Sequence, residues 1–150
     1  MALSVAISSP EMERIAGLAY HNHRARISLA NIVSESYTVD SNVADWDSIQ
    51  ISGNGYSPFT QVIATGGYDS TDGRWEMGGT AGANTYIEAT YTASGSGFTF
   101  NRIYVVIGVP DGLGGYDEEV YLHSLLTESP SITVAGGSSI KYKIQLAVDN

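Results

Sequence analysis

Apolar and polar residues alternate along most of the chain after residue 24, and this period of two predicts β-strands. In residues 24–29 every second side chain is apolar, which predicts a half-buried strand. Residues 139–148 show the same alternation over a longer stretch, whereas residues 103–107 are apolar on both faces, as expected of a central strand. Further strands are predicted at 46–51, 59–65, 74–77, 86–93, 98–109, 119–126 and 131–134.

The first 22 residues follow a different period. Ser9 and Pro10 suit the N-cap and the first position of a helix. The apolar residues that follow recur at the spacing of one helical face: Met12, Ile15, Ala16 and Ala19. The sequence therefore predicts an N-terminal strand followed by a short helix, which is the one convincing helix in the pattern.

Glycine-rich turns separate the predicted strands at intervals near ten residues. Short strands at this spacing, without β-α-β alternation, predict an all-β fold: an antiparallel β-sandwich or jelly roll with one short N-terminal helix. Because no linker or repeat interrupts the chain, we expect a single domain. Within it, residues 1–30 form an N-terminal strand, helix and docking segment, and residues 24–150 form the β-sandwich body.

The 16 acidic and 7 basic residues give a net charge of −9, and they are unevenly distributed. Residues 1–30 and residues 129–150 each carry +1, whereas residues 31–128 carry thirteen acids against two arginines, for −11. An acidic body lacks the cationic track that nucleic acids need and is repelled by anionic bilayers. We therefore expect no nucleic acid and no membrane as partner, and two milder ends that can meet another protein.

Candidates for catalysis or metal binding are few. The chain has no cysteine, which excludes disulfides and thiolate chemistry, and no apolar run approaches the roughly 18 residues of a membrane span. Acidic pairs at 45/47 and 69/72 offer oxygen ligands for a structural cation or paired carboxylates for hydrolysis, but no EF-hand, nucleophile or phosphate-binding pattern accompanies them. We expect no enzyme activity, no catalytic residue, no cofactor and no metal. The acidic run 117–119 is interpreted as a solvated loop or a docking spot for Lys or Arg.

Aromatic residues close to predicted turns suggest a second kind of site. Aromatic faces stack on sugar rings, and loops are where such sites are built. The residues in these positions are Tyr56, Tyr68, Trp75 and Tyr116. They could form a glycan-binding surface, or they could fill the edge of a β-sandwich core with the hydroxyl groups in water.

Several segments resemble small β-rich virion structural proteins of tailed bacteriophages, including those of cyanophages. The closing segment, residues 128–148, carries the likeness most clearly, because an Ile-x-Val-x-Gly-Gly turn leads into a final alternating strand. The other resembling segments are the helix at 11–19 with the strand at 27–31, the turn at 52–56, and residues 91–95 leading into 100–107.

This resemblance implies a non-catalytic virion protein, often a homotrimer, that contacts the major capsid protein or tail proteins. A chain of this length without collagen-like repeats or heptads resembles a capsid cement or decoration protein, which docks on the head shell and stabilises it. The alternative is a tail-fibre, baseplate or tail-tip protein that binds host surface glycan. A third hypothesis is a separate glycan-binding or glycan-hydrolysing domain.

The docking hypothesis places the contact with the particle in residues 1–30, because this segment differs from the body in pattern and in charge. Its residues are those of the apolar helix stripe and the basic face of the following strand: Met12, Ile15, Ala16, Ala19, Arg24 and Arg26.

Overall fold

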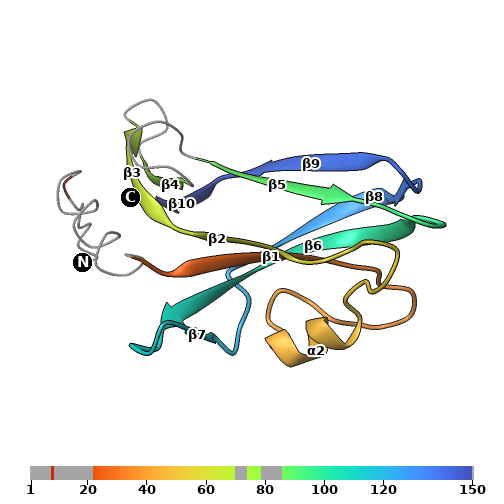
Figure 1. Cartoon of the computed structure of the whole chain (residues 1–150). Helices are drawn as coiled ribbons and strands as arrows, with labels where there is room; N and C mark the ends of the chain where they lie inside the picture. Colours follow the sequence, from red (N-terminus) through yellow and green to blue (C-terminus); the bar gives the residue numbers. More distant parts are fainter. Residues whose placement is uncertain (1–7, 9–21, 70–73, 79–85, 150) are drawn as a thin grey trace, which may run out of the picture. The chain divides into compact units, whose positions relative to one another are not determined.

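A computed structural model describes residues 8, 22–69, 74–78 and 86–149 of the chain (Figure 1). Strands dominate the described residues, and one short helix, α2 (Val43–Ser48), interrupts them. The strands are β1 (Arg24–Ala30), β2 (Phe59–Val62), β3 (Ala64–Asp69), β4 (Arg74–Gly78), β5 (Ile87–Thr92), β6 (Phe98–Pro110), β7 (Tyr116–Glu118), β8 (Ser124–Val134), β9 (Ser139–Ile144) and β10 (Leu146–Asp149).

The strands form three sheets. A five-stranded sheet has the order β2-β1-β6-β7, with β8 also paired to β6; a three-stranded sheet has the order β10-β4-β3; and β5 pairs with β9. The pairings of β1, β7 and β8 with β6, and of β3 and β10 with β4, are all antiparallel. The predicted all-β, antiparallel class is therefore confirmed.

The chain divides into two compact units. Unit 1 comprises residues 1–22, 62–88 and 143–150, and unit 2 comprises residues 23–61 and 89–142. In unit 1, β4 lies between β3 and β10, with Trp75 paired to Tyr68 on one side and to Val148 on the other. Unit 2 contains the five-stranded sheet except for the end of β2.

Strand β6 is the centre of unit 2, as its doubly apolar pattern predicted. Ile103, Val105 and Ile107 are buried on one face, and Tyr104 and Val106 are buried on the other. Each residue of β1 has a partner on this strand. A strand flanked on both sides and covered on both faces needs apolar side chains at every position, which explains the run.

The pairing of β6 with β8 is interrupted by a bulge in β8. The register with β8 shifts between Phe100 and Arg102, so that four β8 residues, 128–131, lie between two successive pairs. Asn101 fills the irregular position, and its side-chain amide donates to the Ile32 carbonyl at 2.7 Å and accepts from the Ile32 amide at 2.8 Å. Pro130 thus lies inside a strand but at a bulge, where it removes no ladder hydrogen bond.

The two faces of the five-stranded sheet carry different layers (Figure 1). One face meets β5, where the buried Tyr91 hydroxyl donates to the Ile27 carbonyl at 2.7 Å. The Tyr91 ring stacks on Tyr56, which in turn meets Phe98 edge-on. The opposite face is covered by α2 through Trp46, which is fully buried. Both faces of β1 are therefore closed to water.

The predicted strand at 46–51 is wrong, because residues 43–48 form helix α2. Asn42 caps this helix, accepting the Asp45 amide at 2.8 Å on its side-chain oxygen. Val43 and Trp46, three residues apart, face the core together, and the Trp46 indole donates to the Thr38 carbonyl at 3.0 Å. Two apolar residues at helical spacing are too few to distinguish this short helix from a strand by sequence pattern alone.

Other predicted strands have shifted boundaries. The strand predicted at 119–126 begins only at Ser124, the first residue of β8, because residues 119–123 connect β7 to β8. The long alternating segment 139–148 is one pattern but two strands: β9 pairs with β5 and β10 pairs with β4, and the change of partner falls at Gln145. The predicted N-terminal strand and helix lie outside the described residues.

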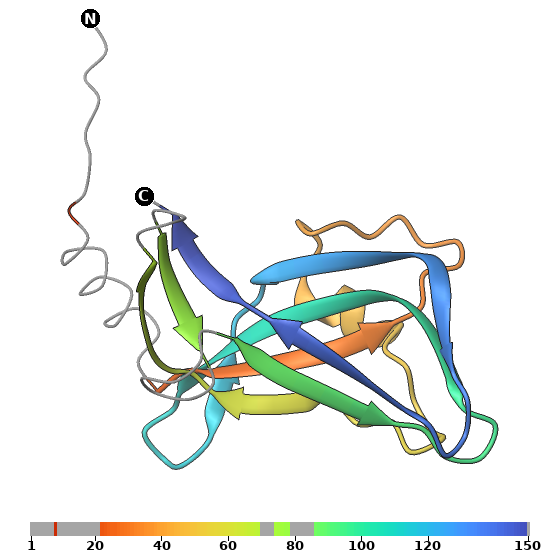
Figure 2. The same cartoon turned by 90° about the horizontal axis from the view of Figure 1, so that it is seen from above.

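Three glycine-rich turns interlock at one end of unit 2 (Figure 2). The Ser94 amide donates to the Asn54 carbonyl at 2.8 Å, and the Asn54 side chain donates to the Gly97 carbonyl at 2.7 Å. The third turn joins them where the Gly137 amide donates to the Ala93 carbonyl at 2.7 Å. Backbone therefore packs on backbone here, and at Gly97 and Gly136 an added Cβ would collide with a neighbouring turn.

Candidate functional site

The basic face of β1 is buried, contrary to the prediction of a half-buried strand. Arg26 retains only 8% of its exposure and Ser28 none. The reason is α2, which covers this face and brings an acidic residue, Asp47, against it. A second carboxylate, Glu118, reaches the same point from β7.

All three nitrogens of the Arg26 guanidinium donate to an acceptor. Nε donates to Glu118 Oε2 at 2.8 Å, and Nη2 lies 2.7 Å from the same oxygen. Nη1 donates to Ser28 Oγ at 2.8 Å and to Asp47 Oδ1 at 3.1 Å, while Nη2 donates to Asp47 Oδ2, also at 3.1 Å. This fork-to-fork geometry with a carboxylate is the strongest form of charge-assisted hydrogen bonding. We call these four residues the Arg26 network.

Two further side chains fix the position of Asp47. The Tyr104 hydroxyl donates to Asp47 Oδ1 at 2.8 Å, and the Gln50 amide donates to the Tyr104 oxygen at 2.7 Å. The Tyr104 ring also lies 5.8 Å from the centre of the Arg26 guanidinium. Each oxygen of Asp47 is thus engaged from the sheet side, and α2 is attached to the sheet by charge as well as by Trp46.

The Arg26 guanidinium stays charged at every pH at which the protein folds. Burial alone would lower its pKa, but the hydrogen bonds and negative charges of Glu118 and Asp47 outweigh this and raise its pKa above the ordinary value. Burial has the opposite effect on Tyr104: it raises the pKa of the phenol, so that the hydroxyl remains a donor toward Asp47.

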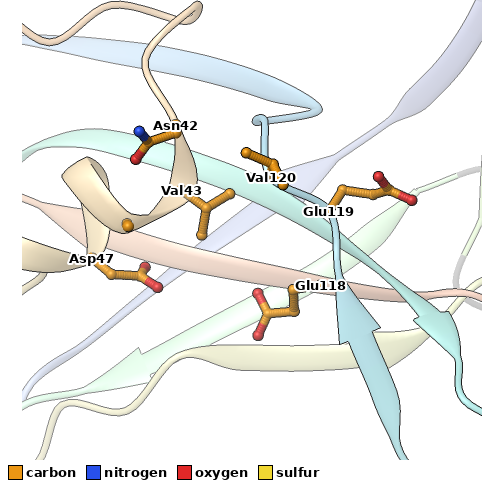
Figure 3. A pocket seen from close by; sticks show the side chains of 7 residues that line it. Asn42, Val43, Asp47, Glu118, Glu119 and Val120 are labelled. Atoms are coloured by element: carbon orange, nitrogen blue, oxygen red, sulfur yellow. The ribbon is translucent and has the colours of Figure 1, made fainter.

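A pocket of about 480 Å³ lies beside this cluster (Figure 3). The figure shows the Asp47 and Glu118 carboxylates turned toward each other from α2 and β7, while the Glu119 carboxylate points away. The remaining wall is partly apolar; the full lining is Asn42, Val43, Ala44, Asp47, Glu118, Glu119 and Val120.

Paired carboxylates that flank a pocket can act as general acid and base, but these two are ion-paired to the same arginine. Protonation of either carboxylate would remove a negative charge that pairs with Arg26. The interpretation of residues 117–119 as a docking spot for an arginine holds for Glu118, which binds Arg26 and lies 3.9 Å from Arg24 of the same chain. The described residues contain no cluster of three or more His, Cys, Asp or Glu suited to a metal.

The proposed glycan-contact residues of unit 2 do not come together. Tyr56 belongs to the core, where its hydroxyl accepts the Leu29 amide at 2.9 Å and burial raises its pKa. Tyr116 lies under Arg24, with the guanidinium 4.8 Å from the ring centroid. Because Arg24 and Leu29 are five residues apart on β1, these contacts are separated by roughly 16 Å. Tyr56 therefore follows the core-edge alternative, with its hydroxyl bonded to the backbone rather than to water.

The other predicted site residues are placed as follows. Tyr68 and Trp75 are cross-strand partners on β3 and β4 of unit 1. Arg24 is half-buried against Tyr116, and Arg26 is enclosed in its network, so Arg26 is not an exposed docking side chain. The helix stripe lies outside the described residues: Met12, Ile15, Ala16 and Ala19.

Sequence reasoning missed the Arg26 network because its members are far apart in the chain. Asp47 is 21 residues and Glu118 is 92 residues from Arg26. The one local signal is an arginine on the polar face of a strand whose apolar face is fully buried. Such a signal points to an ion pair but does not identify the partner.

His123 provides a pH-dependent contribution to stability. It lies in the connection between β7 and β8, and burial lowers its pKa below the ordinary value of 6.5. The unfolded chain therefore takes up a proton first as the pH falls below about 6.5, and the folded state loses stability down to the lowered pKa. We expect His123→Gln to flatten the decline in unfolding free energy between pH 7.5 and 5, measured by urea denaturation. The other two histidines are present in both proteins, and an unchanged slope would contradict the assignment.

Comparison with known proteins adds no relative: no protein-family model, no curated protein and no solved structure matches this chain. Among the described residues, no helix has the length and apolar character needed to cross a bilayer.

Proposed function

We propose that this chain is a non-enzymatic structural protein of a tailed-phage virion, and that it acts as a capsid cement or decoration protein. The observation that carries the proposal is the Arg26 network. The two carboxylates that border the pocket, Asp47 of α2 and Glu118 of β7, are both bound to the buried Arg26 of β1. This network of hydrogen bonds therefore connects α2 and β7 to β1. Such a constellation serves stiffness rather than turnover.

The finer fold assignment belongs to this proposal. We infer that the five-stranded sheet and the β5–β9 pair form a β-sandwich or jelly roll. The Tyr91–Ile27 hydrogen bond and the Phe100–Tyr142 edge contact support it, because each joins residues of the two sheets across unit 2. Two packed sheets resist bending better than one, which suits a protein that holds a shell against internal pressure.

The proposed partners are further copies of this chain, as a homotrimer, and the major capsid protein. The −11 charge of residues 31–128 supports a protein partner with basic patches and argues against nucleic acid. The N-terminal segment that precedes β1, residues 1–22, is the proposed arm that reaches the shell.

Immunogold labelling of purified virions tests this proposal. We expect label on the head, and we expect a chain lacking residues 2–22 to keep the unfolding transition of unit 2 but to be absent from particles. Label at the tail end would instead favour the fibre, baseplate or tail-tip alternative. Absence of the protein from purified virions, or normal incorporation of the truncated chain, would contradict the virion role or the arm, respectively.

A further inference from the structure

The turn between β6 and β7 presents one large apolar side chain to solvent. Leu113 is 92% exposed, more than any other large apolar residue described. Leu113 lies midway between the end of β6 and the start of β7, and the hairpin that these strands form points away from α2 (Figures 1 and 2). We call residues 110–116 the β6–β7 tip.

The β6–β7 tip is held rigid by one aspartate. Asp111 Oδ1 accepts the Leu113 amide at 2.7 Å and the Gly115 amide at 2.9 Å, and the Asp111 amide donates to the Gly115 carbonyl at 3.1 Å. These donated hydrogen bonds also lower the pKa of the Asp111 carboxyl. Leu113 is therefore displayed on an ordered turn, so that little backbone entropy remains to be lost on binding.

The base of the hairpin is anchored to the rest of unit 2. Pro110 pairs with Tyr116 and Gly108 with Glu118. Tyr116 carries the Arg24 guanidinium on its ring, and Glu118 belongs to the Arg26 network. A load applied at the tip is thus transmitted directly to the most strongly bonded part of the sheet.

The charge around the tip defines the partner. The hairpin and the residues after it contain four acids, of which Glu118 is paired with Arg26; the other three are exposed: Asp111, Asp117 and Glu119. A partner that accepts Leu113 in an apolar pocket must meet these acids with basic side chains at the rim. The acidic body of a second copy, with −11 over residues 31–128, does not fit, and neither does an anionic bilayer.

We propose that the β6–β7 tip is a docking element that inserts Leu113 into an apolar, basic-rimmed pocket of a different protein of the particle. The inference rests on the proposed virion function and adds a second contact to the N-terminal arm. The buried ion network gives this contact a physical purpose, because it holds the hairpin in the orientation that insertion requires.

Binding of the labelled full chain to virions from a phage lacking its gene tests the proposal by co-sedimentation. We expect Leu113→Ser to weaken binding by about tenfold or more, because insertion of a leucine buries a full aliphatic side chain. Leu113→Met, which keeps an apolar side chain of similar volume, should stay within about threefold of the unchanged protein. The affinity of the unchanged protein should fall as NaCl is raised.

Val33→Ser is the matched control, since Val33 is 82% exposed on another loop of unit 2 and undergoes the same apolar-to-hydroxyl change. It should bind as the unchanged protein does, and all variants should keep its unfolding midpoint, because these side chains contact solvent. Equal binding of Leu113→Ser and the unchanged protein would overturn the docking element alone. Failure of the unchanged protein to bind would overturn the virion role and the docking element together.

Discussion

Arg26→Met lowers the free energy of unfolding of unit 2 by about 2–3 kcal/mol. Removing one partner of a buried ion cluster leaves the other charges without compensation, which costs about 3–5 kcal/mol when they are fully buried. Here the side chains of Asp47 and Glu118 keep 42% and 31% of their exposure, so water recovers part of the loss. Methionine fills much of the arginine's volume, so the change reports on charge and hydrogen bonding more than on a cavity.

Arg24→Met is the matched control for this measurement. Arg24 lies two positions earlier on the same strand and loses the same charge, but its side chain is 30% exposed and 3.9 Å from Glu118. Among the described residues its buried Nε has no acceptor, so the substitution also removes an unsatisfied donor. We expect a loss below about 1 kcal/mol. Equal losses for the two variants in urea denaturation would mean that net charge, not the Arg26 network, stabilises unit 2.

Gly97→Ala destabilises unit 2 by more than about 3 kcal/mol or prevents its folding. Gly97 has a φ of +79°, a left-handed conformation that costs an L-residue roughly 1–2 kcal/mol. In addition, an alanine Cβ at this position would collide with the Val134 carbonyl oxygen and lie 3.1 Å from the Gly136 nitrogen. These atoms are backbone inside the interlocked turns, and they cannot move without separating the turns.

Gly137→Ala separates the two causes. Gly137 has a similar φ of +85°, but an added Cβ there meets nothing within 4 Å. It should therefore lose only the conformational cost, about 1–2 kcal/mol. The measurement is the unfolding midpoint of each variant by circular dichroism in urea, relative to the unchanged protein. If both variants lose the same amount, the close approach of the turns contributes nothing and only the φ angle matters.

The two experiments address different parts of unit 2. The arginine variants act where α2 and β7 meet β1, and the glycine variants act at the end where three turns interlock. Neither set of variants changes Leu113. Weak particle binding by Leu113→Ser therefore reports on the β6–β7 tip, and not on the Arg26 network or the interlocked turns.

Much of the strand pattern was predictable because alternation records burial. Strand β9 shows it clearly: Lys141 and Lys143 are exposed, whereas Tyr142 and Ile144 face inward. The continuous apolar run in β6 correctly marked a central strand. Periodicity cannot tell where a strand changes partner, and the division at Gln145 was therefore invisible to it.

Local signals failed where few residues carried them. Helix α2 has six residues, and the alternation that predicted a strand at 46–51 was accidental. The helix depends on Trp46, whose ring packs against that of Tyr104 on the distant strand β6. The two ring centroids are 5.6 Å apart. A helix this short is stable because of its tertiary contacts rather than its own propensity.

The sequence by itself determined the all-β class, the central strand and the glycine-rich turns, since all three follow from side chains and backbone freedom within a few residues. Only the tertiary structure decided which carboxylates meet Arg26, that the polar face of β1 is buried, and that Tyr56 belongs to the core. The physical reason is that these features depend on pairs separated by tens of residues, and the chain must close on itself before a charge can select its partner.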